Sequence, residues 1–476
     1  MRALIWFRSD LRVVDQPALA AATAAADEGV IGLFVLTPRQ WLRHDWGPAR
    51  VAFLLGCLAE LRERLAELHI PLLIRQVTDF SRVPAMVAKV MDEHGCRVCY
   101  ANSEFEVNEQ ARDGQVAERL AQRGRELRLS QDQCLVPPGR LTTGAGKPYR
   151  VFTPFKKAWL AHCQDRGLPE RAWRARKQST LDLASDDIPV RVRGFAAEPS
   201  ALRYWQPGSA AGEHLLQRFC RDRIRSYEQE RDRPDLDATS GLSPYLAIGA
   251  ISIGQCFRAA IAANDGEMVG GDGGVQTWIS ELIWREFYRH ILVAFPRVGR
   301  HRAFQSATEG LRWRDDPAQE TAWQEGRTGI PIVDAAMRQL HETGWMHNRL
   351  RMVVAMFFSK NLFLDWRRGE RHFMQQLVDG DLASNNGGWQ WSASTGTDAA
   401  PYFRVFNPYS QSERFDPDGS FIRNWVPELA DLQGKDLHDP GRLSAEERRR
   451  RDYPDAIVDC KASRKRAIAA FQRVIK

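Results

Sequence analysis

The sequence predicts an α/β domain with a parallel sheet, then a long connection, then an all-helical domain. Three observations lead to this prediction. Over the first ~130 residues, short apolar runs alternate with longer amphipathic ones, a pattern typical of βα units with helices on both faces of a sheet. Proline, glycine and charged residues then dominate as far as Gly208. From Ala211 onward strand signals nearly vanish, and helical periodicity continues to Lys476.

The same pattern gives the domain boundaries. We expect the α/β domain at residues 1–130, the linker at 131–210 and the helical domain at 211–476. With 43% hydrophobic and 27% charged residues, the chain is long enough for two or three cores. It has no run of about 18 apolar residues, and its start turns charged at Arg8 and Asp10, so we expect neither a membrane span nor a secretory signal. We expect a monomer in the cytoplasm.

Four apolar runs are the expected strands: residues 3–7, 30–37, 71–77 and 97–102. The turn after the first run reads RSDLRVVDQP and lacks the GxGxxG that cradles a dinucleotide pyrophosphate. A ligand should instead lie at the carboxyl edge of the sheet, where the residues after the second and fourth strands gather. Those residues include His44, Glu106, Asn108 and Glu109. Solvated loop side chains would give the same pattern.

Charge and cysteine content narrow the function only slightly. The net charge of +7 and the pI near 9.0 are compatible with a polyanionic partner, although many proteins without one share them. Cys96 and Cys99 form a CxxC inside an expected strand, with no second pair of ligands nearby. Two buried thiols are therefore favoured over a zinc or redox site, and we expect no metal.

The stretch from Asp379 to Asn407 reads DGDLASNNGGWQWSASTGTDAAPYFRVFN and carries the most unusual chemistry of the chain. Its acids accept hydrogen bonds, its amides donate and accept them, and its paired glycines let the backbone approach a flat ligand. These groups are Asp379, Asp381, Asn385, Asn386, Trp389 and Trp391. A ligand pocket explains them, and so does an N-capped turn with buried tryptophans.

A second candidate lies at residues 239–243, which read TSGLS before Pro244. Ser243 before a proline is a good helix start, and the hydroxyls and free N–H groups ahead of it would suit a phosphate. An ordinary N-cap is the alternative.

The third candidate is a helix over TWISELIWREFYRH, residues 277–290. Spacings of three and four place an acid, a tryptophan, an arginine and a tyrosine on one face: Glu281, Trp284, Arg285 and Tyr288. An exposed ion-pair face with a half-covered tryptophan is the alternative.

A fourth candidate follows a helix that Pro331 can start and Gly344 can end. A new helix is expected from Trp345, with Asn348, Arg351 and Met352 sharing one face. Three further tryptophans have polar neighbours in this half of the chain: Trp313, Trp366 and Trp389. Most tryptophans are structural, and their spacing alone shows no connection among them.

Several of these segments together resemble the photolyase and cryptochrome family, and bacterial class I cyclobutane pyrimidine dimer photolyases in particular. The motifs run in the same order from Met1 to Ile457: WFRSDLR, TPRQW, EVNEQARD, FTPFKKAW, ELIWREFYRH, TGIPIVDAAMRQL, TGWMHNRLRM and DGDLASNNGGWQWSASTGTDAAPYFRVFNP. The resemblance implies an amino-terminal α/β antenna domain, a long linker and a helical domain that holds FAD.

The resemblance also assigns residues to the flavin. The turn at 239–243 falls where the family binds the flavin phosphates, and Asn385 falls where an amide faces the flavin ring nitrogen N5. The residues that match the FAD site are Tyr227, Thr239, Ser240, Gly241, Leu242, Ser243, Trp278, Arg285, Arg351, Asp379, Asp381 and Asn385.

The implied reaction is light-driven repair of UV-damaged DNA, in which an electron passes from excited FADH⁻ to a flipped-out pyrimidine dimer. The residues that match the dimer pocket and the DNA phosphate contacts are Glu281, Trp284, Asn348, Arg349, Met352, Trp391 and Arg404. The matching photoreduction chain is Trp389, Trp366 and Trp313. A (6-4) repair enzyme is disfavoured, since that subfamily has histidines where this chain has Asn348 and Met352.

The resemblance leaves the antenna pigment open. His44, Asn108 and Glu109 fit members that bind methenyltetrahydrofolate, but Gly299 and Arg300 depart from the Cys-Lys pair of a folate-binding member. We expect folate, with deazaflavin second and an empty site as a further possibility. A cryptochrome that signals through partners is the alternative function.

Overall fold

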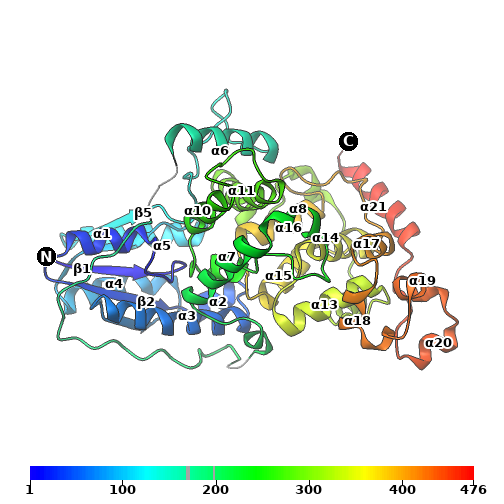
Figure 1. Ribbon diagram of the computed structural model, residues 1–476, viewed down its shortest axis with the longest axis horizontal. Helices are drawn as coiled ribbons and strands as arrows, with labels where there is room; N and C mark the ends of the chain where they lie inside the picture. The colour runs from blue at the N-terminus through cyan, green and yellow to red at the C-terminus, as the bar shows by residue number, and fades with distance from the viewer. Residues whose placement is uncertain (168–171, 197–198, 476) are drawn as a thin grey trace. The chain divides into compact units, whose positions relative to one another are not determined.

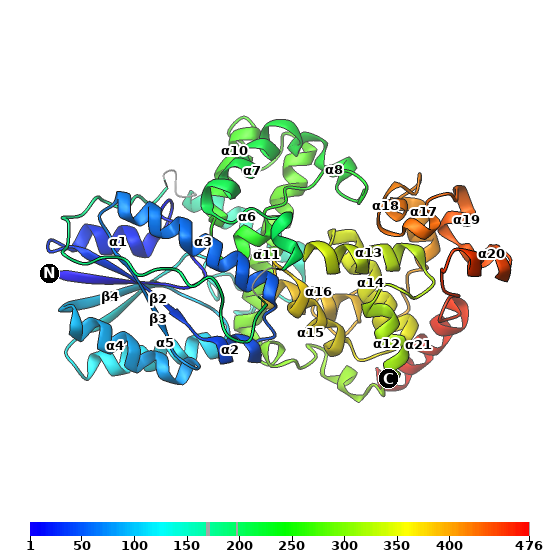
Figure 2. The same ribbon diagram turned by 90° about the horizontal axis from the view of Figure 1, so that it is seen from below.

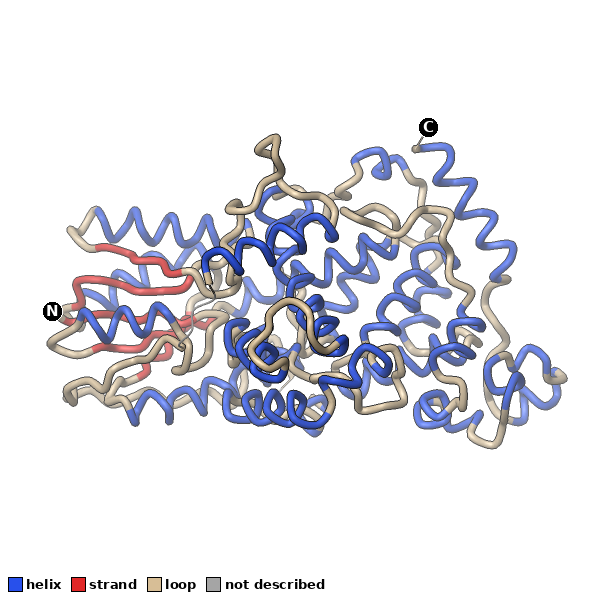
Figure 3. Tube along the Cα trace, turned by 45° about the horizontal axis from the view of Figure 1, so that its top comes forward, coloured by secondary structure: helices blue, strands red, loops and turns tan. Residues whose placement is uncertain are grey.

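The computed structural model of the chain describes residues 1–167, 172–196 and 199–475. It contains two compact units. Unit 1 consists of residues 1–225, 240–296 and 378–381, and unit 2 consists of residues 226–239, 297–377 and 382–476. The strands gather in the amino-terminal part, and the rest of the described chain is helical (Figure 3). The predicted fold class is confirmed.

Unit 1 is built on a five-stranded parallel sheet with the order β3-β2-β1-β4-β5. Its strands are β1 (Arg2–Phe7), β2 (Val30–Leu36), β3 (Leu72–Gln76), β4 (Cys96–Asn102) and β5 (Glu126–Ser130). The central strand β1 is buried from Ala3 to Phe7, and every residue of β2 is buried. Such continuous burial is typical of parallel strands covered on both faces.

Helices cover both faces of this sheet. The covering helices are α1 (Pro17–Ala25), α3 (Pro48–Glu67), α4 (Val83–Glu93) and α5 (Val107–Ala121). Helices α1 and α3 lie on one face, and α4 and α5 lie on the other (Figure 2). The other helices of unit 1 are α2 (Pro38–Arg43), α6 (Phe152–Arg166), α7 (Ser209–Asp222), α9 (Ser243–Ala247), α10 (Ile253–Ala263) and α11 (Gly273–Ala294).

Unit 2 is helical (Figure 1). Its α-helices are α8 (Tyr227–Glu230), α12 (Pro317–Gln324), α13 (Pro331–Thr343), α14 (Asn348–Met356), α15 (Trp366–Gln376), α16 (Leu382–Ser392), α17 (Pro408–Phe415), α18 (Ser420–Trp425), α19 (Gly434–His438), α20 (Ala445–Arg450) and α21 (Cys460–Val474). A π-helical turn, η6 (Phe357–Leu362), continues α14. The core of unit 2 is rich in large aromatic rings, among them Trp323, Trp366 and Trp389.

The four predicted strands are confirmed, and β5 is an additional one. Strand β5 reads ELRLS and is largely exposed at the sheet edge, so it lacks the apolar run that marks the others. The segment expected to connect the domains contains α6, whose Phe155 and Trp159 are buried and whose neighbour is α11. No helix in the described residues is long and apolar enough to cross a membrane.

Helix ends follow the predicted signals in one case and differ in another. Helix α13 begins at Pro331 and ends before Gly344, which has a left-handed backbone with φ of 65°. The next helix begins at Asn348 and not at Trp345. The reason is that His347 caps it: its Nδ1 accepts a hydrogen bond from the Arg349 N–H at 3.2 Å.

Candidate functional site

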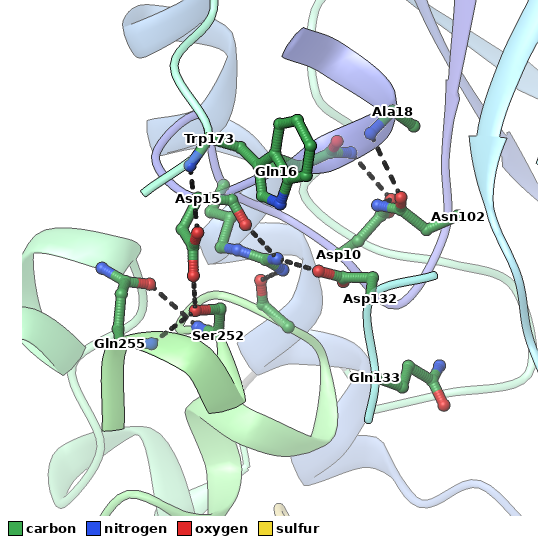
Figure 4. Close-up of polar contacts among 12 residues, drawn as sticks. Asp10, Asp15, Gln16, Ala18, Asn102, Asp132, Gln133, Trp173, Ser252 and Gln255 are labelled. Carbon is green, nitrogen blue, oxygen red and sulfur yellow. Dashed lines mark hydrogen bonds and ion pairs between the residues drawn. The ribbon is translucent and has the colours of Figure 1, made fainter. Parts of the chain in front are cut away.

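The turn after β1 is filled by protein side chains (Figure 4). Asp10 accepts hydrogen bonds from Gln16 at 2.9 Å and from Asn102 at 2.7 Å. Burial raises the pKa of Asp10 to about 6, although the neighbouring Arg8 acts in the opposite direction. Asp15 accepts hydrogen bonds from the Trp173 N–H at 3.1 Å and from the Ser252 hydroxyl at the start of α10. These buried bonds occupy the turn where a Rossmann domain would hold a pyrophosphate.

The three predicted antenna residues come together at the carboxyl edge of the sheet. The His44 Nε2 lies 2.9 Å from the Asn108 amide nitrogen and 2.8 Å from the Gln40 amide nitrogen, and its Nδ1 lies 3.4 Å from Glu109 Oε1. Two approaching amides make Nε2 an acceptor, so Nδ1 carries the proton toward Glu109. Burial and the carboxylate of Glu106 raise the pKa of Glu109. Glu109 Oε2 is buried and has no hydrogen-bond partner in the described chain.

Arg50 is a cation of the same region that sequence reasoning missed. It is 6% exposed, in the first turn of α3, and its guanidinium lies 3.8 Å above the Trp46 ring. Among the described residues it makes no hydrogen bond or ion pair, and its Nε is buried without a partner. Burial lowers the pKa of Arg50 to about 10, against the nearby carboxylates of Asp381 and Glu106. A buried, unpaired cation stacked on an indole suits an anionic or electron-rich ligand.

Helix α11 carries four of the predicted residues. Trp278 is buried, with its ring 5.0 Å from Phe219. Trp284 is half-buried, and one face of its indole stacks on Phe152 at 3.6 Å with an interplanar angle of 8°. Only its other face is therefore available to a flat ligand. Glu281 is also half-buried on this helix.

Arg285 bonds only to neutral protein groups. Its guanidinium donates to the backbone oxygens of Gln133 at 2.8 Å and Leu246 at 3.2 Å, and it has no ion pair in the described chain. Burial lowers the pKa of Arg285 to about 10, and the neighbouring Arg289 adds to the shift. A cation held in this way suits an anionic ligand.

Asp381, a predicted ligand residue, is held by a residue that the sequence analysis did not select. Arg289 is 3% exposed, and its Nη2 lies 2.5 Å from Asp381 Oδ2. Arg289 follows Arg285 by one helical turn on α11, so the spacing of four was the signal that could have found it. Asp379 is buried in the same unit.

The predicted phosphate turn is only partly as expected. Helix α9 begins at Ser243 with Pro244 in its first turn, as predicted. The helix has only five residues, so its dipole is small and binding would depend on the turn itself. Gly241 has φ of +65°, and a Cβ there would have only Trp205 within 4 Å, at 3.9 Å. Ser240 and Leu242 flank this glycine in unit 1, whereas Thr239 belongs to unit 2.

In unit 2, Asn385 on α16 has a fixed orientation. Its Nδ2 donates to the backbone oxygen of Glu370 at 3.0 Å, and its Oδ1 accepts no hydrogen bond from the described residues. The Glu370 carboxylate is 1% exposed, accepts from the Asn386 amide at 2.8 Å and lies 3.1 Å from the ring Nδ1 of the exposed His301. The fixed amide therefore offers Asn385 Oδ1 to a donor on a ligand.

The three predicted electron-transfer tryptophans differ in their exposure to solvent. Trp389 is 2% exposed and packs on Gly369, one turn from Trp366 on α15; a Cβ at Gly369 would lie 2.2 Å from the indole. Trp366 is fully buried. Trp313 is partly exposed and precedes Arg314, which pairs with Leu364 two residues before Trp366. Trp389 and Trp366 are thus both buried, and Trp313 is the most exposed of the three.

The start of α14 presents the predicted DNA residues. Asn348 is exposed, and Met352 and Trp391 are half-buried. Arg349 binds Asp232 through two hydrogen bonds, of 2.6 and 3.2 Å, and its guanidinium lies 4.4 Å above the Phe415 ring. Its pairing must be exchanged before it can hold a phosphate. Arg404, by contrast, is exposed and its guanidinium makes no ion pair in the described chain.

The remaining flavin residues lie elsewhere in unit 2. Tyr227 is buried at the start of α8, with the Arg231 guanidinium 5.4 Å from its ring. Arg351 donates from Nε to the backbone oxygen of Met346 at 2.8 Å. Each unit has groups that are suited to a flavin nucleotide. Unit 1 has Arg285, which makes no ion pair in the described chain, and the open turn at Gly241. Unit 2 has the oriented amide oxygen of Asn385.

Two family models match the chain. Residues 3–174 match the family described as DNA photolyase, and residues 278–473 match the FAD binding domain of DNA photolyase. The chain belongs to the DNA photolyase family. It is 44% identical over 473 residues to deoxyribodipyrimidine photo-lyase of Escherichia coli (strain K12), with 99% of each chain covered.

Two solved structures share the architecture over nearly the full length. A class III photolyase from Agrobacterium tumefaciens has a TM-score of 0.88 at 33% identity, with coverage of 100% of this chain and 98% of that chain. A cryptochrome from Synechocystis sp. PCC6803 has a TM-score of 0.83 at 27% identity, with 99% of each chain covered. The fold is therefore common to a photolyase and a cryptochrome, and fold alone does not decide the function.

Proposed function

We propose that this chain is a light-dependent DNA repair enzyme that splits cyclobutane pyrimidine dimers, the activity of a deoxyribodipyrimidine photo-lyase. The observation that carries the proposal is the 44% identity to the photo-lyase of Escherichia coli over 99% of both chains. The cryptochrome match has 27% identity, so it supports the shared fold more than a shared function.

The chain binds FAD through the domain that spans residues 278–473. When bound in its reduced form, FAD would supply, on excitation by blue light, the electron that starts the splitting of the cyclobutane ring. In our proposal Arg285 and the Ser240–Ser243 turn hold the negative part of the cofactor, and Asn385 Oδ1 accepts a hydrogen bond from its ring. The other proposed FAD residues are Tyr227, Thr239, Trp278, Arg351, Asp379 and Asp381.

Five side chains are proposed to receive the flipped-out dimer. The free face of Trp284 and the indole of Trp391 would stack on the pyrimidines, and Met352 would fill the space beside them. Glu281 and Asn348 would hydrogen bond to the base edges. Arg349 and Arg404 would hold flanking phosphates, which gives affinity without sequence specificity.

Trp389, Trp366 and Trp313 are proposed to carry an electron from the protein surface to the interior of unit 2. The partial exposure of Trp313 supports this direction, because the outermost tryptophan must meet a reductant in solution. These three tryptophans would restore the reduced cofactor and would not take part in the repair reaction itself.

We propose that His44, Asn108 and Glu109 bind an antenna pigment, methenyltetrahydrofolate in the first place and deazaflavin in the second. The unpaired Arg50 cation favours a pigment with an acidic group. An absorption spectrum of the purified protein separates the two pigments from flavin alone.

The proposed division of labour is an antenna domain at residues 1–130, a linker at 131–210 and a catalytic domain at 211–476. We further propose that the protein acts as a monomer in the cytoplasm, where DNA lies in bacteria such as the source of its photo-lyase relative.

Binding in the dark tests repair against signalling. The purified protein should prefer an oligonucleotide with one thymine dimer over the undamaged one by at least about 10³-fold. Trp284→Ala should weaken this binding by 1–3 kcal/mol, roughly the worth of one stacked base, and should leave FAD bound. Trp173→Ala, which removes an exposed indole of the same unit, is the matched control. Equal affinity for both oligonucleotides would favour the cryptochrome function.

A further inference from the structure

Lys360 is a buried cation whose contacts are unusual. It lies in the π-helical turn η6, which continues α14, and it is 0% exposed. It makes no ion pair within the described chain. Its ammonium donates instead to two backbone oxygens, that of Arg404 at 2.8 Å and that of Pro401 at 3.5 Å. Lysine is almost never fully buried without a charged partner, so this position requires an explanation.

Both oxygens belong to one turn. The Arg404 N–H donates to the Pro401 oxygen at 2.9 Å, which closes a turn of four residues over the ammonium. A second bond docks the same loop on the same helix, because the Phe406 N–H lies 3.2 Å from the Met356 sulfur, one turn before Lys360. Helix α14 with its η6 extension thus holds the loop at two points.

The outer side of this turn is presented to solvent. Phe403 is 57% exposed, and the exposed Arg404 side chain makes no hydrogen bond or ion pair with the described residues. Its guanidinium lies 5.6 Å from the centre of the Phe406 ring. The Lys360 ammonium therefore holds the backbone of the turn, while the Arg404 guanidinium on the solvent side can bind a partner.

Charge indicates the chemistry of that partner. Burial lowers the pKa of Lys360 to about 7, and the nearby charge of Arg404 adds to the shift. Two neighbouring cations repel each other, and an anion bound at Arg404 would relieve that repulsion. π-Helical turns inside α-helices also occur frequently at functional sites.

We propose that Lys360 is a positioning residue for DNA: its buried ammonium fixes the turn Pro401–Arg404 so that Arg404 meets a phosphate beside the lesion. The proposal rests on the proposed repair function and adds a residue that never touches DNA. A lysine is suited to the task, since three donors on one nitrogen can satisfy more than one carbonyl oxygen.

A double-mutant cycle tests the coupling. Lys360→Met keeps most of the side-chain volume and removes the donors, and Arg404→Ala removes the guanidinium. Each single change should weaken binding to a dimer-containing duplex about tenfold, and Arg404→Ala should lower the salt slope by about one phosphate contact. The double variant should bind no worse than Arg404→Ala alone, because Lys360 acts only through Arg404.

Kinetics separate positioning from general damage. Under saturating light, Lys360→Met should raise the KM for DNA while kcat and the bound FAD spectrum stay unchanged. Lys465→Met, a lysine on α21, is the matched control and should change neither. Additive losses in the cycle, or unchanged binding by Lys360→Met, would overturn the proposal. If Lys360→Met does not fold, Lys360→Leu, which also removes the donors, takes its place in the same cycle.

Hydrogen exchange without DNA keeps this inference separate from the proposed function. The N–H groups of residues 404–406 should exchange faster in Lys360→Met than in the unmodified protein. Equal exchange rates in the two proteins would show that Lys360 does not hold the loop, even if repair occurs. Faster exchange in a protein that does not bind dimers would leave the tie standing and refute the repair function.

Discussion

The two units bury their polar and aromatic side chains in different ways. In unit 1 the carboxyl edge of the sheet is lined with charges, such as the buried pair of Arg112 and Glu104 at 2.7 Å and the unpaired Arg50. In unit 2 the interior around Trp389 is lined with rings, including Trp323 and Phe373 at 6.0 and 5.1 Å. Fixed charges can orient an ionic pigment, whereas closely packed rings offer a route for an electron. In our proposal the charged edge serves light collection and the ring-lined interior serves electron supply.

The largest expected effect concerns the ring-lined interior. Trp366→Phe should slow photoreduction of oxidised FAD by at least about a hundredfold, because it removes the middle tryptophan of the proposed electron route. This loss corresponds to an increase of about 2.7 kcal/mol in barrier height. Repair by enzyme reduced beforehand should not change. Trp323→Phe is the control, since Trp323 is also buried and touches Trp389 but lies outside the proposed chain. An equal loss in both variants would mean that the electron follows another route.

The next effect concerns the charged edge. Arg50→Met should weaken binding of the antenna pigment about 10- to 150-fold, the worth of a hydrogen bond to a charged group. Pigment content can be read from the absorption spectrum of protein titrated with folate or deazaflavin. Arg62→Met changes an arginine of the same helix that pairs with Asp187 at 3.1 Å and should leave binding intact. Unchanged pigment binding by Arg50→Met would remove Arg50 from the site.

The smallest effect concerns stability in acid. Burial lowers the pKa of His290 in unit 1 and of His347 in unit 2 from 6.5 to about 4. Each folded histidine stays neutral while the unfolded one takes up a proton, so its stabilisation is complete above pH 6.5 and is lost as the pH falls toward 4. When the pH falls from 7 to 5, the free energy of unfolding should decrease by about 2 kcal/mol for each of the two histidines.

Urea unfolding at both pH values checks this expectation. His290→Asn and His347→Asn should each reduce the difference between pH 7 and pH 5. A difference unchanged by His347→Asn would show that this histidine is already protonated, or solvated, in the folded protein.

The fold was predictable where burial is one-sided or complete. Continuous apolar runs marked β1 to β4, and the proline and glycine signals marked α13, because these elements obey local rules. Strand β5 carries charges at an exposed edge, and α6 has buried rings within a segment rich in loop residues. Tertiary contacts, which no local pattern reports, decide both.

For the site, the identity of several residues was predictable, but their contacts were not. Residue types and helical spacing select Arg285 and Asn385, but no spacing shows that one bonds only to carbonyl oxygens and the other to Glu370. Arg50 and Lys360 look like ordinary surface cations in the sequence. Only burial and the absence of ion pairs among the described residues mark them as functional candidates.

The most direct test of the account is repair itself. The purified protein, with its flavin reduced, is mixed with an oligonucleotide that contains one thymine dimer and is illuminated with blue light. We expect recovery of thymine absorbance near the ultraviolet maximum under light and none in the dark. Binding of the dimer without any light-driven recovery would contradict it.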